Sequence, residues 1–131
     1  MQYYPLYNLC PHPIHLRCAR GHIQIIGTED FCLRATTEIQ RSLPEVNHIP
    51  VKTYPQFNGI QDQAKFLELY DGKDILVSTI AAQCIPSFFT GRVFVPASGP
   101  GDSSRSPNGT IISQCLYLYN HRENMLTQQL E

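Results

Sequence analysis

Hydrophobic and polar residues alternate in two short stretches near the start of the chain. Residues 13–18 place Ile14 and Leu16 on one side and polar residues on the other, and residues 22–26 alternate in the same way. Such alternation predicts half-buried β-strands, because successive side chains of a strand point to opposite faces. The short connection between them ends in Gly21, so a β-hairpin is expected.

The clearest segment lies at residues 74–96. The apolar run at 75–77 predicts a buried strand, and the small residues that follow predict a helix capped by Ser78 or Thr79. Pro86 ends that helix, and a second apolar strand closes the segment. The sequence therefore predicts one β-α-β unit, whose two strands are parallel.

Four further segments complete the expected elements. Residues 31–35 are expected to form a third strand and residues 61–70 a short helix. Residues 97–107 are rich in Gly, Ser and Pro, which predicts a flexible polar loop. An Asn-Gly turn then leads into residues 110–119, which predict one long strand. The expected fold class is α+β, with a strand-rich mixed sheet.

Length and composition limit the classes of function. The 131 residues suit one compact domain at 1–120 with a polar tail at 121–131. The net charge of −1 provides no basic excess for a dedicated nucleic-acid binder. No window is long and apolar enough to predict a membrane span, and no signal peptide is expected. Five scattered cysteines favour free thiols in a reducing, cytoplasmic compartment.

The opening motif Asn8-Leu9-Cys10-Pro11-His12 resembles the Asn-Leu-Thr-Pro-His opening of a family of small proteins of bacteriophage and prophage genomes. Segments similar to residues 75–82, 93–96 and 108–118 also occur in that family in the same order. The chain differs in having Cys10 where the family has Thr, and in a longer loop after the Val-Pro strand end. The resemblance implies a fold and a viral or mobile-element origin, and it implies no chemistry.

One candidate site combines the predicted helix start with the polar loop. A helix N-terminus offers unpaired N–H donors that suit an anion. Ligands gather outside the carboxyl ends of parallel strands, so the helix start and the polar loop are expected to contact the same anion. The candidate ligand-binding residues are Ser78, Thr79, Ser98, Gly99, Ser103, Ser104 and Arg105. The alternative is an ordinary helix cap beside an ordinary loop. Standard dinucleotide and triphosphate motifs do not occur in the sequence.

A second candidate is catalytic. Cys10 and His12 are two residues apart, so in an extended segment they share a face and suit a nucleophile and its base. The alternative is that Cys10 belongs to a turn, where its side chain holds the local backbone. His15, Cys18 and His22 extend this Cys/His cluster, but its spacing matches no zinc pattern, so neither a metal nor another cofactor is predicted.

Aromatic residues provide a third candidate surface. Tyr3, Tyr4 and Tyr7 lie near the start, and Tyr117 and Tyr119 alternate on the last predicted strand. Aromatic faces stack on bases or sugars, but they more often cover cores and subunit contacts. Because the charge is balanced, packing or a homodimer face is favoured over nucleic acid.

Three functions therefore remain open from the sequence. The first is a small intracellular module that binds an anionic, nucleotide-like ligand. The second is a small hydrolase or transferase that acts on such a ligand through His12 and Cys10. The third is a protein-interaction factor that works through its aromatic strand faces. The sequence leaves open whether any reaction is catalysed.

Overall fold

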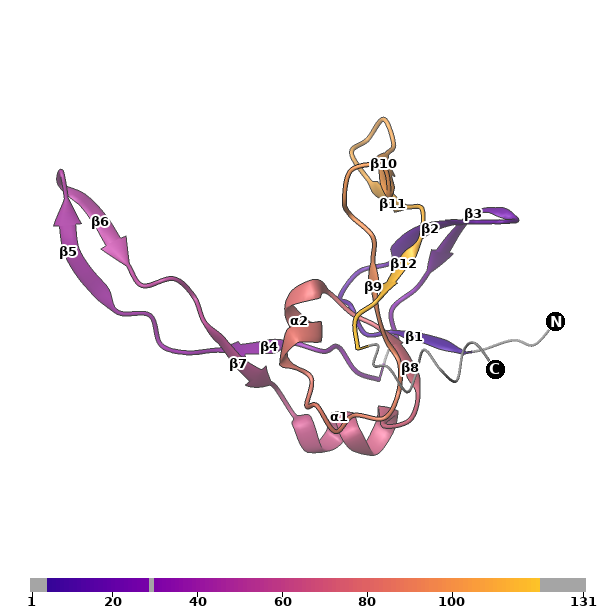
Figure 1. The fold of residues 1–131 in the computed structure, drawn as a ribbon, viewed down its shortest axis with the longest axis horizontal. Helices are drawn as coiled ribbons and strands as arrows, with labels where there is room; N and C mark the ends of the chain where they lie inside the picture. The colour runs from indigo at the N-terminus through magenta and orange to yellow at the C-terminus, as the bar shows by residue number, and fades with distance from the viewer. Residues whose placement is uncertain (1–4, 29, 121–131) are drawn as a thin grey trace.

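Twelve short strands and two short helices make up the described part of the chain. The computed structural model describes residues 5–28 and 30–120 and shows a strand-rich fold of mixed α+β class, which confirms the predicted class (Figure 1). The predicted tail at 121–131 lies outside the described residues, as do Tyr3 and Tyr4.

The central sheet contains the predicted β-α-β unit. In spatial order it consists of β1 (Leu6–Asn8), β8 (Asp74–Leu76), β9 (Val93–Pro96) and β12 (Leu116–Leu118). The first three strands run parallel, β12 runs antiparallel to β9, and α2 (Thr79–Cys84) connects β8 to β9. Ile75 packs into the main core and Leu76 into a second cluster, so both faces of β8 are covered. This explains the continuous apolar run.

A second sheet contains the predicted hairpin. In spatial order it consists of β10 (Ser103–Arg105), β11 (Ile111–Ser113), β2 (Ile14–Cys18) and β3 (Gly21–Ile25). The hairpin of β2 and β3 is confirmed, with Ile14 opposite Ile25 and Cys18 opposite Gly21. Gly21 has a φ of 110°, a backbone conformation that side chains disfavour, so glycine fits this turn.

The single strand predicted for residues 110–119 is wrong. The segment forms two strands, β11 and β12, which belong to different sheets. Ile112 and Ser113 are both buried although they are adjacent, so the alternation of a single strand is broken there. The amide of Gln114 donates to the Asp102 carbonyl at 2.7 Å, and the amide of Ala97 donates to the Cys115 carbonyl at 3.1 Å. The chain therefore crosses from one sheet to the other at residues 114–115.

Two other local predictions are corrected. Residues 31–34 form no strand, and the strand begins later, as β4 (Ala35–Thr37). Phe31 and Leu33 alternate because they enter the core, and alternation alone does not show that a segment pairs in a sheet. The loop predicted at 97–107 contains β10, which pairs antiparallel with β11. This polar edge strand carries no apolar alternation that the sequence could show.

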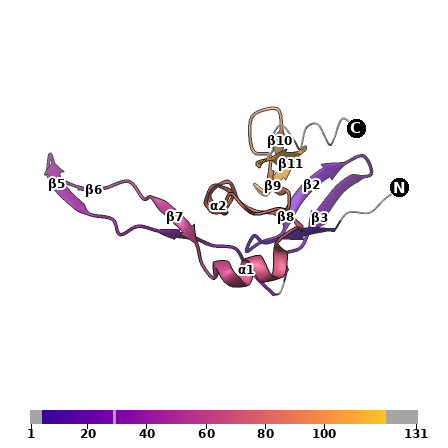
Figure 2. The same cartoon turned by 60° about the horizontal axis from the view of Figure 1, so that its bottom comes forward.

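An extended arm at residues 35–60 projects from the rest of the molecule (Figures 1 and 2). Its base pairs β4 with β7 (Phe57–Ile60), and its tip pairs β5 (Ser42–Val46) with β6 (Ile49–Lys52). The sequence does not predict a projecting arm.

The main core lies between the central sheet and the two helices. The short helix predicted at 61–70 is present as α1 (Gln63–Tyr70), whose buried residues are Phe66 and Tyr70. Phe66 stacks on Phe89 with ring centroids 5.2 Å apart. The second, smaller cluster is formed by Cys10, Ile14, Leu16 and Leu76. It joins β2 to β8 and so brings the two sheets together.

Candidate functional site

A pocket of about 480 Å³ lies where the two sheets meet. Its walls come from four separate segments: the opening motif with the start of β2, the start of α2, the end of β9, and the hairpin of β10 and β11. Ser78 follows β8, and Ser98 follows β9. Because β8 and β9 are parallel, their carboxyl ends meet at this edge of the central sheet.

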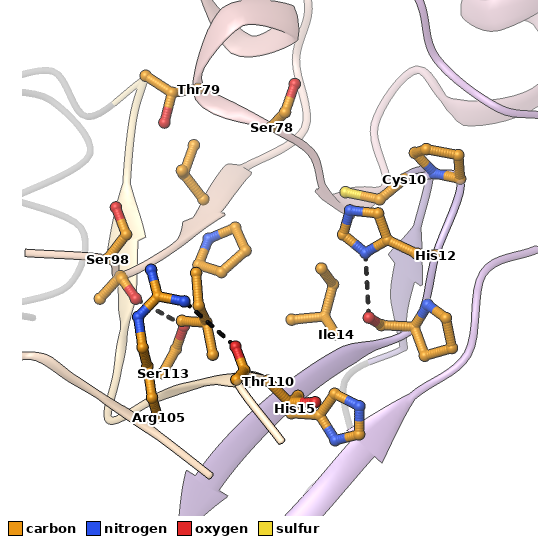
Figure 3. Close-up of a pocket in the computed structure, with 17 residues that line it drawn as sticks. Cys10, His12, Ile14, His15, Ser78, Thr79, Ser98, Arg105, Thr110 and Ser113 are labelled. Carbon is orange, nitrogen blue, oxygen red and sulfur yellow. Dashed lines mark hydrogen bonds between the residues drawn. The ribbon is translucent and has the colours of Figure 1, made fainter. Parts of the chain in front are cut away.

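The structure brings six of the predicted site residues into this one pocket. They are Cys10, His12, Ser78, Thr79, Ser98 and Arg105. Figure 3 shows Arg105 and Ser98 on one side of the pocket, with Cys10 and His12 on the other. The predicted anion site and the predicted catalytic pair are therefore parts of the same cavity.

Three predicted ligand-binding residues do not line the pocket: Gly99, Ser103 and Ser104. The Ser103 hydroxyl donates to the Gly99 carbonyl at 3.3 Å, and the Gln114 side-chain amide donates to the Ser104 hydroxyl at 3.2 Å. These residues stabilise the loop from within.

Sequence reasoning missed His15, Thr110 and Ser113 as pocket residues. His15 stands out in the sequence as a member of the Cys/His cluster. Thr110 and Ser113 carry no sequence signal, because they reach the pocket only through the parallel pairing of β11 with β2. The Ser113 hydroxyl is buried and donates to the Ala97 carbonyl at 2.6 Å, so it ties β11 to the end of β9.

Asn8 holds the opening motif in place. Its side chain is 1% exposed, and its Oδ1 accepts a hydrogen bond from the Cys10 amide at 2.9 Å. Its Nδ2 donates to the carbonyls of His12 at 3.1 Å and of Ile25 at 2.9 Å. One buried amide thus fixes the turn that carries Cys10 and His12, and it links that turn to the end of β3.

Arg105 is a cation in the pocket wall without a carboxylate partner among the described residues. One of its N–H groups donates to the Gly109 carbonyl at 3.2 Å, which holds the guanidinium in the β10–β11 hairpin. Arg92, by contrast, is paired with Asp74 at 2.6 Å. A guanidinium has five N–H donors, so Arg105 keeps donors for a bidentate contact with a phosphate or carboxylate.

The two histidines add further polar groups. Nδ1 of His12 lies 3.1 Å from the Pro13 carbonyl, and since a carbonyl only accepts, that nitrogen carries the proton. In the neutral ring Nε2 is then the hydrogen-bond acceptor. Nδ1 of His15 lies 3.0 Å from Nε2 of His22, so the His15 ring is held against β3.

The pocket lining carries basic and hydroxyl side chains. Of the described residues that line it, none is Asp or Glu, whereas Arg105, His12 and His15 all contribute. Hydroxyl groups that can donate come from Ser78, Thr79, Ser98 and Thr110, whereas the Ser113 hydroxyl already donates to the Ala97 carbonyl. The Arg105 guanidinium and these hydroxyls favour a negatively charged ligand.

The start of α2 contributes hydroxyl groups more than free amides. Ser78 is the N-cap, as predicted, and its hydroxyl accepts a hydrogen bond from the Ala81 amide at 3.2 Å. The Ala82 amide donates to the Ser78 carbonyl at 2.9 Å. The helix has only six residues, so we place the main attraction for an anion at Arg105.

Cys10 has the chemistry of a buried structural thiol. Burial raises its pKa to about 11, and the nearby Cys32 adds to the effect. Its sulfur is 3.9 Å from the Leu76 carbonyl, to which the thiol donates. Because the thiolate is the nucleophile, a thiol that stays protonated at neutral pH is a weak one. This weighs against the nucleophile–base hypothesis for Cys10 and His12.

The Cys/His cluster does not converge on one point. His15 and His22 touch each other, whereas Cys10 is buried in the pocket wall and Cys18 is exposed at the end of β2. Within the described ranges, no three His, Cys, Asp or Glu side chains are grouped as a metal site requires. All five cysteines are free thiols.

Comparison with known proteins gives no assignment of function. No protein-family model, no curated protein and no solved structure matches the chain. Neither of the two helices in residues 5–28 and 30–120 has the length and apolar character needed to cross a membrane.

Proposed function

We propose that this protein is a small binding module for an anionic ligand, and that the ligand occupies the pocket between the two sheets. One observation carries the proposal: the described lining combines Arg105, two histidines and several hydroxyls with no acidic side chain. Removal of water from a phosphate or carboxylate is unfavourable unless charged donors replace it. Arg105, which lacks an internal carboxylate partner among the described residues, provides that replacement.

The size and the apolar wall of the pocket favour a nucleotide-like ligand. Ligand pockets for small molecules usually measure about 300–1,000 Å³, and this one is about 480 Å³. Ile14, Val95 and Pro96 give it an apolar wall, on which the flat face of a base or sugar can rest. We therefore assign the anionic part of the ligand to Arg105 and the ring to the apolar wall.

Binding is favoured over catalysis by the state of Cys10. With a pKa of about 11 the thiol is protonated at neutral pH, so Cys10 is disfavoured as the nucleophile of the hydrolase or transferase hypothesis. A bound water activated by His12 as base would still allow turnover. The His12→Ala variant would then lose that turnover. Conversion of the bound compound by the wild type would show that reaction.

We place this module inside the cell, in a viral or mobile-element context. The five free thiols support a reducing compartment. The resemblance of the opening motif at residues 8–12 to bacteriophage and prophage proteins supports the origin.

The proposal is tested by purifying the protein from cells, denaturing it and weighing the small molecules that it releases. We expect an anionic compound of nucleotide-like mass from the wild type and much less from Arg105→Gln. Arg20→Gln is the matched control, because Arg20 lies in the exposed β2–β3 turn outside the pocket. Release of neutral compounds alone, or equal amounts from Arg105→Gln and wild type, would contradict the proposal.

A further inference from the structure

A second cavity, of about 370 Å³, adjoins the pocket between the two sheets. Residues 10–13 of the opening motif line both, so one turn of the chain forms a wall of each. The other walls of the second cavity come from residues 26–28, which follow β3, and from Cys32 and Arg34, which precede β4. Residues 11–13 are exposed, so the shared wall is open to solvent and a ligand can lie across it.

Backbone contacts hold the second cavity in one shape. The Leu33 amide donates to the Leu9 carbonyl at 2.9 Å, which places the segment that carries Arg34 beside the opening motif. A Cβ atom on Gly27 would lie 2.9 Å from the Cys10 carbonyl oxygen, so the chain after β3 also lies directly against that motif. The cavity is therefore a fixed part of the fold, and a ligand does not have to order it on binding.

Arg34 is the cation of the second cavity. Its carbonyl accepts a hydrogen bond from the Gln61 amide at 2.9 Å, which fixes its backbone at the base of the arm. Arg34 is exposed, and within residues 5–28 and 30–120 it forms no ion pair with a carboxylate. None of the described residues that line the cavity is Asp or Glu. The guanidinium therefore keeps its N–H donors for a phosphate, as Arg105 does in the first pocket.

The second cavity repeats the composition of the first pocket. In each of them one arginine accompanies apolar side chains, and the described lining contains no carboxylate. The apolar surface of the second cavity comes from Pro11, Pro13 and Ile26. Ile26 is 73% exposed, so its side chain is accessible to the flat face of a base or sugar. Each cavity thus suits one phosphate and one ring.

The position of the shared turn and the charge of the chain limit the length of the ligand. Figure 3 shows His12, which belongs to this turn, across the first pocket from Arg105. A ligand whose phosphate contacts Arg105 therefore faces the turn that also lines the second cavity. With a net charge of −1 the chain has no extended basic surface for a long nucleic-acid strand. Two arginines in two adjoining cavities suit two phosphates.

We propose that the ligand is a dinucleotide, with one nucleotide unit in each cavity and its two phosphates on Arg105 and Arg34. This inference rests on the proposed function, because one half of the dinucleotide occupies the pocket already described. The second cavity adds the choice of a two-unit ligand over a mononucleotide.

Isothermal titration calorimetry tests the inference by comparing ligands of one and two units. For at least one base, the 5′-phosphorylated dinucleotides pApA and pUpU are expected to bind the wild type with a Kd at least about ten-fold below that of adenosine or uridine monophosphate. The reason is one further charge-assisted contact. Adenosine diphosphate is the control for charge, because its second phosphate brings no second nucleoside, and it is expected to lack this gain.

Two substitutions in the second cavity are expected to bring the ratio of the two Kd values close to one. Arg34→Gln removes the cation, with Arg20→Gln in the exposed β2–β3 turn as the matched control. Ile26→Asp introduces a carboxylate at an exposed position that tolerates it, with Ile39→Asp as the control, since Ile39 is 93% exposed on the arm. Both controls are expected to keep the ten-fold ratio, and circular dichroism checks that all four variants are folded.

The outcomes separate this inference from the proposed function. Mononucleotide binding with an equal Kd for the dinucleotides overturns the inference alone, whereas a wild type that binds none of these compounds overturns both. The inference is also overturned if Arg34→Gln keeps the ten-fold ratio, or if adenosine diphosphate shows the same gain. An octanucleotide that binds far more tightly than either dinucleotide would overturn it as well, because the ligand would then be a nucleic-acid strand.

Discussion

At the scale of single residues, the opening motif is explained by burial and by backbone hydrogen bonds. Leu9 has no exposed surface, and Asn8 directs its amide to three backbone groups. These two residues build the turn, and His12 is placed at the pocket as a result. The motif thus combines a structural part with a part that faces the proposed ligand.

Replacement of Asn8 by Ala is expected to destabilise the fold by about 2–4 kcal/mol. The substitution leaves the Cys10 amide and the carbonyls of His12 and Ile25 without their partner. Urea denaturation of the two proteins measures the difference in free energy of unfolding. Asn58→Ala is the control, since Asn58 is exposed and accepts a hydrogen bond only from the Thr36 hydroxyl among the contacts described. Equal stability of both variants would contradict the structural role of Asn8.

Cys10 gives a prediction of pH dependence. Burial raises the pKa of Cys10 from an ordinary thiol's 9.0 to about 11, so the folded state favours the protonated thiol. Its contribution to stability is complete below pH 9 and is lost as the pH rises through 11. The free energy of unfolding of the wild type should therefore decrease over this interval by on the order of 2 kcal/mol more than that of Cys10→Ala.

Alkylation measures the same property of Cys10 directly. At pH 8 the exposed thiols of Cys18 and Cys115 are expected to react with iodoacetamide well before Cys10 does. Mass spectrometry of the peptides gives the order of reaction. A Cys10 that reacts first at pH 8 would show a thiolate in the pocket and would restore the nucleophile hypothesis.

At the scale of elements, local patterns predict a strand or helix well when the whole element buries one face against a single core. The β2–β3 hairpin and the β-α-β unit at 74–96 follow from apolar residues that are close in sequence. The division of residues 110–119 into two strands does not follow from nearby residues, because the change of sheet at 114–115 depends on pairing with strands far away in the chain. β10 also escapes prediction, because its three residues are polar and show no apolar alternation.

Gly91 is an element-scale constraint that a substitution can test. A Cβ atom at this position would lie 1.9 Å from the Lys73 carbonyl oxygen, so the turn before β8 and the turn before β9 approach too closely for any side chain. Gly91→Ala is expected to lower the free energy of unfolding by more than about 2 kcal/mol. Gly59→Ala is the control, because its nearest neighbour would be the Thr36 hydroxyl at 3.5 Å. Similar melting temperatures for both variants would contradict this packing.

At the scale of the whole molecule, the pocket results from the way in which two sheets meet. The parallel order of β8 and β9 is predictable, and it brings Ser78, Thr79 and Ser98 to one edge. The approach of the opening motif and of Arg105 depends on the second sheet, in which β2 pairs with β11 and β11 with β10. No local pattern encodes the pairing of β2 with β11 or of β11 with β10, so the sequence names six of the pocket residues without showing that they enclose a single cavity.

The most direct test of the account is a melting-temperature screen with small anions. Adenosine monophosphate, uridine monophosphate, glucose 1-phosphate and pyrophosphate are the probes, and adenosine and glucose are the uncharged controls. A probe at about one hundred times its Kd stabilises the fold by about 2.7 kcal/mol, which raises the melting temperature by roughly 10 °C. We predict such a shift for at least one anion with the wild type and with Arg20→Gln, and its loss with Arg105→Gln. A wild type that no anion stabilises, or a shift that Arg105→Gln retains in full, would contradict the account.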